Sequence, residues 1–516
     1  MCGLDETGRR ELVERPDHRA ARESGLLGEC AGRGKAVAVG QRPLRDPVDD
    51  PVHEVGRAGH LAHDERDGAG GTGHALQPRR GRREVVPRKC AKWIFCPRHF
   101  RAGMGAMQTY RQSRRLRDVR YDVRGPILSE AMRLEAEGHD VLRLNLGNMR
   151  PFGLDARPEL VDAVARSLED GQAYSDSRGI PAAREAVADY YRRCGVRGVS
   201  PADVFCGNGV SELITLVLQA MVDPGDEILV PAPDYPTWTG AVNLTGGVPV
   251  HYLADEANGW NPSLEDIESR ITPRTTALVM INPNNPTGAV YSEETVRGMA
   301  DIARRYGLVL LSDEIYEKLV FGDAVHHHAA LAAGDDVLCL TFGGLSKAYR
   351  VCGYRAGWVV ATGPLDRATD LLEGLTLLSN MRVCPGVPGQ FAIPVALAED
   401  SPWGPEVVDP DGRIERQLAL TAERLNAIPG VSCVAPRGAL YCFPRIDREM
   451  YGIDDDEEFV LDLLRSEHIL VTHGTGFNWP DPDHFRIVCL PEAGVLERAV
   501  GAIARHLESR LTVAVS

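Results

Sequence analysis

Residues 277–316, ALVMINPNNPTGAVYSEETVRGMADIARRYGLVLLSDEIY, contain two short apolar runs separated by a turn-rich stretch and a helical pattern. The first run is LVMI at 278–281, and the second is LVLL at 308–311. Apolar runs that alternate with helical patterns are typical of α/β proteins with a mostly parallel sheet. The same alternation extends outward in both directions, with further apolar runs at residues 204–206, 228–230, 337–340 and 358–360. The sequence therefore predicts an α/β fold.

Polar or glycine residues follow most of these apolar runs. In open α/β sheets, ligands bind beyond the carboxyl ends of the strands. We therefore expect a site built from GlyAsnGly at 207–209, ProAlaPro at 231–233, AsnProAsnAsn at 282–285, SerAspGlu at 312–314 and ThrPheGlyGly at 341–344.

The last hundred or so residues have a different pattern. They combine helical segments and short strands, near residues 411–428, 456–467, 440–446 and 485–490. This arrangement predicts a smaller α+β domain. We expect three globular segments, namely residues 107–150 packing with the small domain, a large domain over 151–390 and the small domain over 391–516.

The first hundred residues are unlike the rest. Gly, Arg, Pro and His make up 43 of them, and Met1–Cys90 contains no Ile, Phe, Tyr or Trp. Such a segment has few apolar side chains to offset the entropy of ordering it. We expect residues 1–106 to be disordered or spurious, with the true start at Met104 or Met107. The alternative is a basic arm or a fused DNA-binding module, but the segment shows no amphipathic helix pair.

Composition narrows the class of protein and its partners. The 516 residues are 43% hydrophobic and 25% charged, with a formal net charge of −15, which excludes a fully disordered or fibrous protein. In the first hundred residues Lys and Arg outnumber Asp and Glu by 19 to 15, so the acidic excess lies in the rest of the chain. Neither nucleic acid nor an anionic membrane is therefore expected as a partner. No apolar run reaches the roughly 18 to 20 residues of a membrane-spanning helix, and the start lacks an apolar signal core. We expect a cytoplasmic protein whose twelve cysteines are reduced thiols.

Two glycine-containing turns carry residues suited to binding an anion. GNGVSE, residues 207–212, follows an apolar run and opens a helical pattern, so its N–H groups and the Ser211 hydroxyl could hold a phosphate. The alternative is a strand-to-helix turn capped by Ser211. Lys347 lies in GGLSKAYR, with Arg355 eight residues later. A desolvated lysine is a candidate for Schiff-base chemistry and an arginine can neutralise a phosphate, although an isolated lysine is more often a solvated surface residue.

Asp313 ends the apolar run LVLLS, where a carboxylate is costly unless it contacts a cation or a metal. A protonated pyridine nitrogen would be such a cation, and Tyr316 could reach the ring hydroxyl of the same cofactor. The alternative is a helix N-cap in SerAspGlu. NPNNPTG at 282–288 is turn-rich, and its amides can donate or accept hydrogen bonds.

Together these motifs resemble the class I/II pyridoxal-phosphate aminotransferases of fold type I. The order and spacing of that family are found over residues 108–512, in GNGVSE, NPNNPTG, SDEIY, GLSKAYRVCGYRAGW and FRIVCLP. Within the family the chain is similar to the bacterial glutamate–pyruvate (alanine) aminotransferases, through YDVRGPILSEA, LNLGNMRPFG, APDYPTW, INPNNPTGAVYS, PRGALYCFP and GTGFNWPDPDHFRIV. The resemblance implies a large domain with a mostly parallel seven-stranded sheet and a smaller α+β domain.

The resemblance also implies the cofactor, pyridoxal 5′-phosphate (PLP), and its ring-binding residues. Lys347 would bind the cofactor covalently and then, displaced by substrate, shuttle a proton between the substrate Cα and the cofactor C4′ carbon. Asp313 would keep the pyridine nitrogen protonated. The ring oxygen would be bound by Asn285 and Tyr316, and the ring face would be covered by Tyr235.

The phosphate would be bound by Gly209, Val210, Ser211, Ser346 and Arg355. Tyr174 would reach the phosphate from a second subunit, so the resemblance implies a homodimer. Many relatives carry a serine three residues before the lysine, where this chain has Gly344. The phosphate site would therefore depend more on Ser346.

Arg486 in HFRIV corresponds to the arginine that binds the substrate α-carboxylate, and a planar guanidinium suits a carboxylate through two parallel hydrogen bonds. The backbone of Gly147 would contact the same carboxylate. Arg124 and Tyr121 are candidates for the distal carboxylate of glutamate; the alternative is that they anchor the N-terminal helix. These assignments imply a two-stage, ping-pong exchange of an amino group between alanine/pyruvate and glutamate/2-oxoglutarate.

Three alternative functions stay open. One is a transaminase for valine or an aromatic amino acid, with pocket residues such as Phe152 and Trp238 setting the specificity. The second is a β-lyase that uses the same lysine. The third is a transcription regulator with a DNA-binding module before residue 108.

The triplet His326, His327 and His328 could bind a metal. No carboxylate or cysteine joins these histidines at ligand spacing, so the sequence predicts no metal site.

Overall fold

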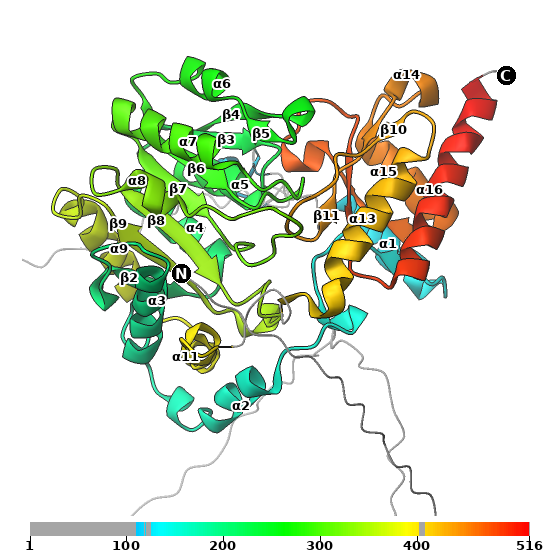
Figure 1. Cartoon of the computed structure of the whole chain (residues 1–516). Helices are drawn as coiled ribbons and strands as arrows, with labels where there is room; N and C mark the ends of the chain where they lie inside the picture. Colours follow the sequence, from blue (N-terminus) through cyan, green and yellow to red (C-terminus); the bar gives the residue numbers. More distant parts are fainter. Residues whose placement is uncertain (1–109, 118, 120–124, 402–407, 515–516) are drawn as a thin grey trace, which may run out of the picture. The chain divides into compact units, whose positions relative to one another are not determined.

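The largest sheet in the computed structural model has eight strands in the order β2-β9-β8-β7-β6-β3-β4-β5 (Figure 1). Neighbours from β8 to β4 run parallel, whereas β9 is antiparallel to both of its neighbours. The bounds are β2 Val204–Gly207, β3 Glu227–Ala232, β4 Val248–Asp255, β5 Asn261–Pro262, β6 Thr275–Ile281, β7 Val309–Asp313, β8 Cys339–Gly344 and β9 Gly357–Thr362. The α/β class is confirmed. The large sheet has the expected seven strands and one more, the two-residue β5 at its edge.

The structure describes residues 110–117, 119, 125–401 and 408–514, all within the unit Ala102–Ser516. The expectations for residues 1–106, Tyr121 and Arg124 lie outside the described residues.

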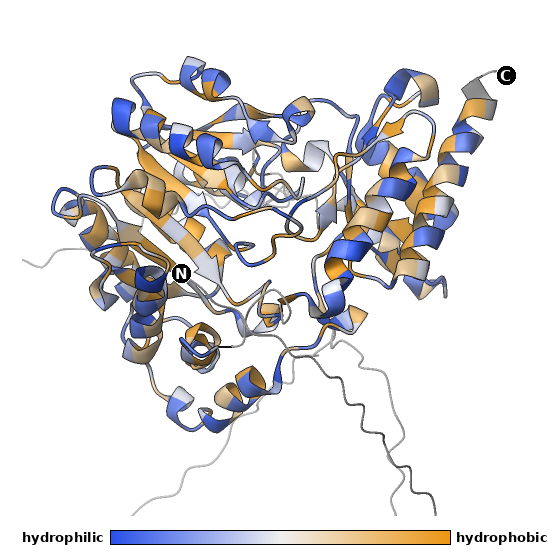
Figure 2. Ribbon diagram, viewed as in Figure 1, coloured by the Kyte–Doolittle hydropathy of each residue, from blue (hydrophilic) through white to orange (hydrophobic). Residues whose placement is uncertain are grey.

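Helices cover both faces of the large sheet, which is why β3, β8 and β9 are buried along their whole length. Alternate residues of each strand point to opposite faces. Val279 faces α4 and α5 in one apolar cluster, and Met280 belongs to a second cluster with α7 and α8. Figure 2 accordingly colours the strands mostly hydrophobic and α3 and α7 largely hydrophilic.

The helices end at residues that the sequence marks. At α7, for example, the Ser292 side chain accepts a hydrogen bond from the backbone N–H of Thr295, Glu293 lies in the first turn, and Gly307 ends the helix with φ of 67°. The α-helices are α1 Pro126–Ala136, α2 Pro158–Arg166, α3 Pro181–Arg193, α4 Val210–Met221, α5 Thr237–Thr245, α6 Leu264–Ser269, α7 Glu293–Tyr306, α8 Ala329–Ala333, α9 Thr369–Met381, α10 Val387–Gln390, α11 Ala392–Leu397, α13 Arg413–Asn426, α14 Arg448–Tyr451, α15 Asp456–Glu467 and α16 Ala493–Ala514. The 3₁₀ turns are η1 Arg114–Leu116, η3 Arg150–Phe152, η4 Asp170–Gln172, η5 Pro201–Asp203, η6 Glu256–Asn258, η7 Cys352–Tyr354, η8 Pro410–Gly412 and η9 Thr475–Phe477.

The C-terminal part of the chain contains short strands and helices, as expected. Its antiparallel sheets have the orders β11-β15-β14 and β10-β12, while β1 pairs in parallel with β13. Glu130 of α1 pairs with Arg465 of α15 at 2.9 Å. The N-terminal segment therefore packs on the C-terminal one; the three domain boundaries stay a prediction. The strand bounds are β1 Leu142–Arg143, β10 Val431–Ser432, β11 Tyr441–Cys442, β12 Arg445–Ile446, β13 Ile469–Leu470, β14 Thr472–His473 and β15 Phe485–Val488.

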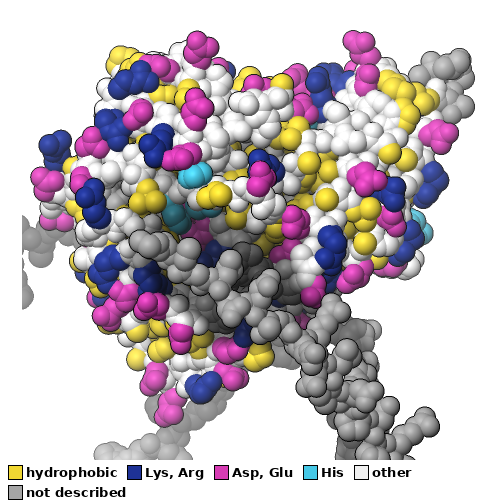
Figure 3. All heavy atoms as spheres, in the orientation of Figure 1, with side chains coloured by type: hydrophobic (Ala, Val, Ile, Leu, Met, Phe, Trp, Pro, Cys, Tyr) yellow, Lys and Arg dark blue, Asp and Glu magenta, His cyan; other side chains and the backbone are white. Residues whose placement is uncertain are grey.

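Acidic and basic side chains are interspersed on the face drawn in Figure 3. Of the helices that the structure describes, none is both long enough and apolar enough to span a bilayer.

Candidate active site

Most of the predicted site residues line one cavity of about 160 Å³. Asp313, at the end of β7, and Lys347, just after β8, both face it, so the cavity lies where the strand ends predict a site. A larger surface depression of about 790 Å³ near Arg445 contains none of the predicted residues. The predicted residues in the smaller cavity are Gly147, Val210, Ser211, Tyr235, Asn285, Asp313, Tyr316, Ser346, Lys347, Arg355 and Arg486.

One end of the cavity is suited to an anion. Helix α4 begins after Gly209, whose φ is 81°, and no described side chain caps this helix end. Ser211 does not act as the cap; its Oγ lies 3.4 Å from the hydroxyl of Tyr235. Arg355 donates to the carbonyl of Asn208 at 2.9 Å, and a Cβ on Gly209 would overlap the guanidinium. Free N–H groups, a hydroxyl and a guanidinium thus converge at the positive end of a helix dipole.

Glu212 holds this loop in place. Its carboxylate accepts hydrogen bonds from the backbone N and side-chain Nδ2 of Asn208, at 2.6 and 2.8 Å, and pairs with Arg382. The loop is therefore ordered by side chains that do not themselves face the cavity.

The glycine at position 344 has a steric reason in this chain. Gly344 pairs with Gly357 of β9, and a Cβ at 344 would lie 3.0 Å from the carbonyl oxygen of Ala356. A serine would crowd the neighbouring strand. Ser346, two residues later, does line the cavity.

Asp313 lies at the floor of the cavity and is 3% exposed. Its Oδ2 accepts a hydrogen bond from Trp238 Nε1 at 3.3 Å, and its Oδ1 accepts one from the backbone N–H of Ile315 at 3.3 Å. Burial raises the pKa of Asp313 to about 6, although these two donors and the nearby Lys347 oppose the rise. A buried carboxylate of this kind gains most from a cationic partner.

Lys347 lies over the ring of Tyr316. Its Nζ donates to the carbonyl oxygen of Gly147 at 3.1 Å and lies 5.8 Å from the ring centre of Tyr316. The hydroxyls of Tyr316 and Tyr441 are 2.7 Å apart. A Cβ on Gly147 would lie 2.7 Å from the Tyr441 hydroxyl and 3.4 Å from Lys347 Nζ, so a side chain there would enter the reacting space.

Arg486, on β15, forms the opposite wall and is 4% exposed. It donates to Asn285 Oδ1 at 2.8 Å and to the carbonyl oxygen of Asn145. The guanidinium carbon lies 4.5 Å from the ring centre of Tyr441 and 4.6 Å from that of Phe477. This sandwich orients the planar group as carboxylate binding requires.

Other predicted residues lie elsewhere. Tyr174 is 83% exposed and does not line the cavity within this chain. Neither Phe152 nor Trp238 lines it; Trp238 is fully buried behind Asp313. Because Arg124 and Tyr121 lie outside the described residues, the distal-carboxylate assignment stays a prediction.

Tyr441 and Phe477 line the cavity and were missed as site residues. Both lie within stretches that resemble the family, PRGALYCFP and GTGFNWPDPDHFRIV, which were the available signal. The sequence does not show that they line the cavity, because they are far from Lys347 along the chain.

Comparison with known proteins identifies the family of this chain. Residues 139–503 match the family "Aminotransferase class I and II", so the chain belongs to that family and is a transaminase. The alanine aminotransferase of Mycobacterium tuberculosis is 54% identical over 78% of this chain and 94% of its own length. A glutamate–pyruvate aminotransferase of Escherichia coli is 50% identical, over 78% of this chain and 98% of the relative. The crystal structure of an Escherichia coli aminotransferase covers 78% of this chain and 99% of its own, with a TM-score of 0.76 and 50% identity.

Enzymes of this family use PLP, and the residues present fit it. The phosphate would meet the start of α4 with Ser211, Ser346 and Arg355, and a pyridinium would meet the buried Asp313. Lys347, whose Nζ faces the same cavity, would reach the aldehyde carbon.

We expect Asp313→Asn to stabilise the apoenzyme while weakening PLP binding. The pKa of Asp313 is about 6 in the folded protein and near 3.8 in the unfolded chain. Its ionised form therefore lowers the free energy of unfolding by about 3 kcal/mol above pH 6, and this cost disappears below about pH 3.8. One hydrogen bond lost by the amide offsets ~1 kcal/mol. The variant apoenzyme should therefore unfold at higher urea than wild type at pH 8, and PLP affinity should fall ~10-fold or more, because the amide cannot pair with a pyridinium.

The stability gain of this variant should shrink as the pH is lowered from 8 to 4.5. A variant apoenzyme that is less stable than wild type at pH 8 would contradict the assignment of a buried, uncompensated charge.

Proposed function

We propose that this transaminase exchanges an amino group between L-alanine and 2-oxoglutarate, forming pyruvate and L-glutamate in two half-reactions. The observation that carries the proposal is the buried Arg486 guanidinium, fixed against Tyr441 beside the Lys347 amine. The relatives named as alanine and glutamate–pyruvate aminotransferases, at 54% and 50% identity, support the choice of substrates.

The arrangement orients an α-amino acid in one way. The ring of Tyr441 contacts the Arg486 guanidinium, and its hydroxyl lies beside Gly147, next to Lys347 Nζ. A substrate carboxylate bound by the two nitrogens of Arg486 therefore places its α-carbon toward Gly147 and Lys347. When bound, PLP supplies the electron sink that makes the α-C–H bond acidic. Lys347 Nζ would take the proton from Cα and pass it to the C4′ carbon of PLP, and in the second half-reaction it would move a proton from C4′ to the Cα of the new amino acid. Tyr316, Tyr441 and Arg486 are each at most 4% exposed, so little water contacts these side chains.

A panel of amino acids tests the proposal. The purified holoenzyme is mixed with one L-amino acid at a time, and the absorbance of the cofactor is followed in a single half-reaction. Alanine and glutamate should convert the cofactor fastest, and pyruvate or 2-oxoglutarate should reverse the change. If valine or an aromatic amino acid converts it faster, another transaminase specificity is correct. If a β-substituted amino acid such as L-cysteine yields pyruvate, ammonia and its β-substituent over many turnovers with no 2-oxo acid added, the lyase alternative is correct.

The homodimer and the cytoplasmic location are parts of the same proposal. Tyr174 is exposed near a loop with other exposed apolar side chains, Met381 and Val383, whose neighbour Arg382 bonds to the carbonyl oxygen of Ser177. Such a patch next to a ligand site suits a contact with a second copy, which sedimentation velocity tests. The eight cysteines that the structure describes are free thiols, as is usual in a reducing compartment.

A further inference from the structure

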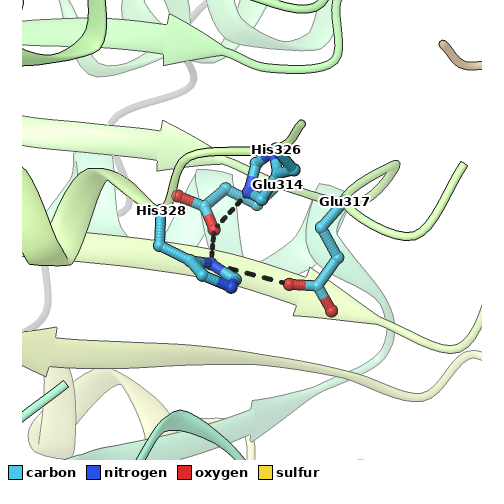
Figure 4. A group of neighbouring side chains, drawn as sticks. All are labelled: Glu314, Glu317, His326 and His328. Atoms are coloured by element: carbon cyan, nitrogen blue, oxygen red, sulfur yellow. Dashed lines mark hydrogen bonds and ion pairs between the residues drawn. The ribbon is translucent and has the colours of Figure 1, made fainter. Parts of the chain in front are cut away.

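Two carboxylates lie against the histidine triplet, contrary to the expectation from sequence spacing. Glu314 and Glu317 follow the end of β7, and the loop after them returns His326 and His328 to the same place (Figure 4). One ligand atom of each residue lies within 4.8 Å of those of the other three. The expectation that no carboxylate joins the histidines is therefore wrong, because 9 to 14 residues of loop close on themselves in the fold.

The distances between the inward-facing atoms are close to the distances between neighbouring ligand atoms in a metal site. Glu314 Oε2 lies 3.1 Å from His326 Nε2 and 2.6 Å from His328 Nδ1, which lies 3.8 Å from Glu317 Oε2. Zinc bonds of about 2.0 to 2.2 Å to nitrogen and oxygen, in a tetrahedron, put ligand atoms about 3.3 Å apart. Small side-chain rotations would therefore surround one ion.

Each carboxylate has one oxygen held from outside the cluster. Glu314 Oε1 accepts from the Ser312 hydroxyl and the backbone N–H of Ala329, both at 2.9 Å. Glu317 Oε1 accepts from the Tyr190 hydroxyl at 2.8 Å. In metal sites, such outer hydrogen bonds orient the ligand oxygens. The Glu317 side chain is 9% exposed, and its Oε2, aimed into the cluster, accepts no hydrogen bond from any described residue.

We propose that Glu314, Glu317, His326 and His328 bind one zinc ion, which ties the 326–328 loop to the end of β7. Two carboxylates balance the charge of a divalent cation when both imidazoles are neutral. Two imidazoles among the ligands favour zinc over magnesium or calcium, which prefer oxygen ligands. The site is next to an open cavity of about 580 Å³, lined by the three histidines, through which an ion can enter.

The histidine triplet supplies its own control. His327 lines the same cavity but is not a member of the cluster. The holoenzyme and its variants Glu317→Gln, His328→Gln and His327→Gln are stripped with EDTA, reloaded with zinc chloride, separated from free metal by gel filtration and assayed for zinc by mass spectrometry. Far-UV circular dichroism of each stripped protein shows whether it is folded.

Wild type and His327→Gln should retain one zinc per chain, and the two ligand variants should retain at least ~10-fold less zinc per chain after the same gel filtration. Magnesium chloride in tenfold excess should not displace the zinc. The proposal fails if wild type retains no zinc, which would make the cluster a set of ion pairs with protonated imidazoles. It also fails if Glu317→Gln, whose shape is conserved, retains as much zinc as wild type, because the metal would then lie elsewhere, for example on thiols. If His328→Gln does not fold, Glu317→Gln alone decides.

Discussion

Lys347→Ala is expected to lower the transamination rate by at least ~10⁴-fold while leaving the fold intact, because the variant loses both the group that moves the Cα proton and the amine that binds the cofactor. General acid–base catalysis by a positioned group is worth up to about 10⁴-fold, and the same amine is also the nucleophile toward the cofactor. Among the lysines that the structure describes, Lys347 lines the cavity, and its Nζ lies 3.1 Å from the Gly147 carbonyl oxygen. The measurement is the alanine–2-oxoglutarate rate of wild type and variant, each saturated with PLP.

Two controls accompany this variant. A small primary amine added to the solution should restore part of the activity, because it can enter the space left by the side chain. Borohydride treatment of wild type followed by peptide mapping should label position 347. A variant that retains more than about a tenth of the activity, or a label on another lysine, would remove Lys347 from the mechanism.

Arg486→Lys lowers kcat/KM for every L-amino acid by ~10²- to 10³-fold. Removing one partner of a buried, hydrogen-bonded charge pair costs about 2 to 5 kcal/mol, and a lysine offers a point charge in place of a planar fork. The cost is high at this position because the guanidinium is 4% exposed and lies between Tyr441 and Phe477. The shorter side chain also leaves the acceptors on Asn285 and Asn145 without their donor.

Amines without a carboxylate provide the control for this variant. Wild type should strongly prefer alanine to ethylamine, and the substitution should reduce that preference by slowing alanine alone. If both substrates slow equally, Arg486 supports the structure of the site rather than the substrate carboxylate.

The structure bears on two alternatives that the sequence left open. Asp313 could be the partner of a cation or a helix N-cap; it accepts hydrogen bonds from the neutral Trp238 indole and the Ile315 N–H, and the structure describes no helix directly after it. Ser211 was open between cap and ligand residue, and its hydroxyl faces Tyr235. These outcomes depend on side-chain directions, which a motif does not specify.

The sequence by itself determined the class of fold, the family and the positions of the main cavity residues, because apolar periodicity and short motifs are local properties of the chain. Only the tertiary structure decided which residues meet across long separations. Arg486 reaches Asn145 and Asn285, Tyr441 joins Tyr316, and Glu314 joins His328. The physical reason is that these contacts are set by the packing of the sheet and the closure of loops, and neither is encoded in spacing along the chain.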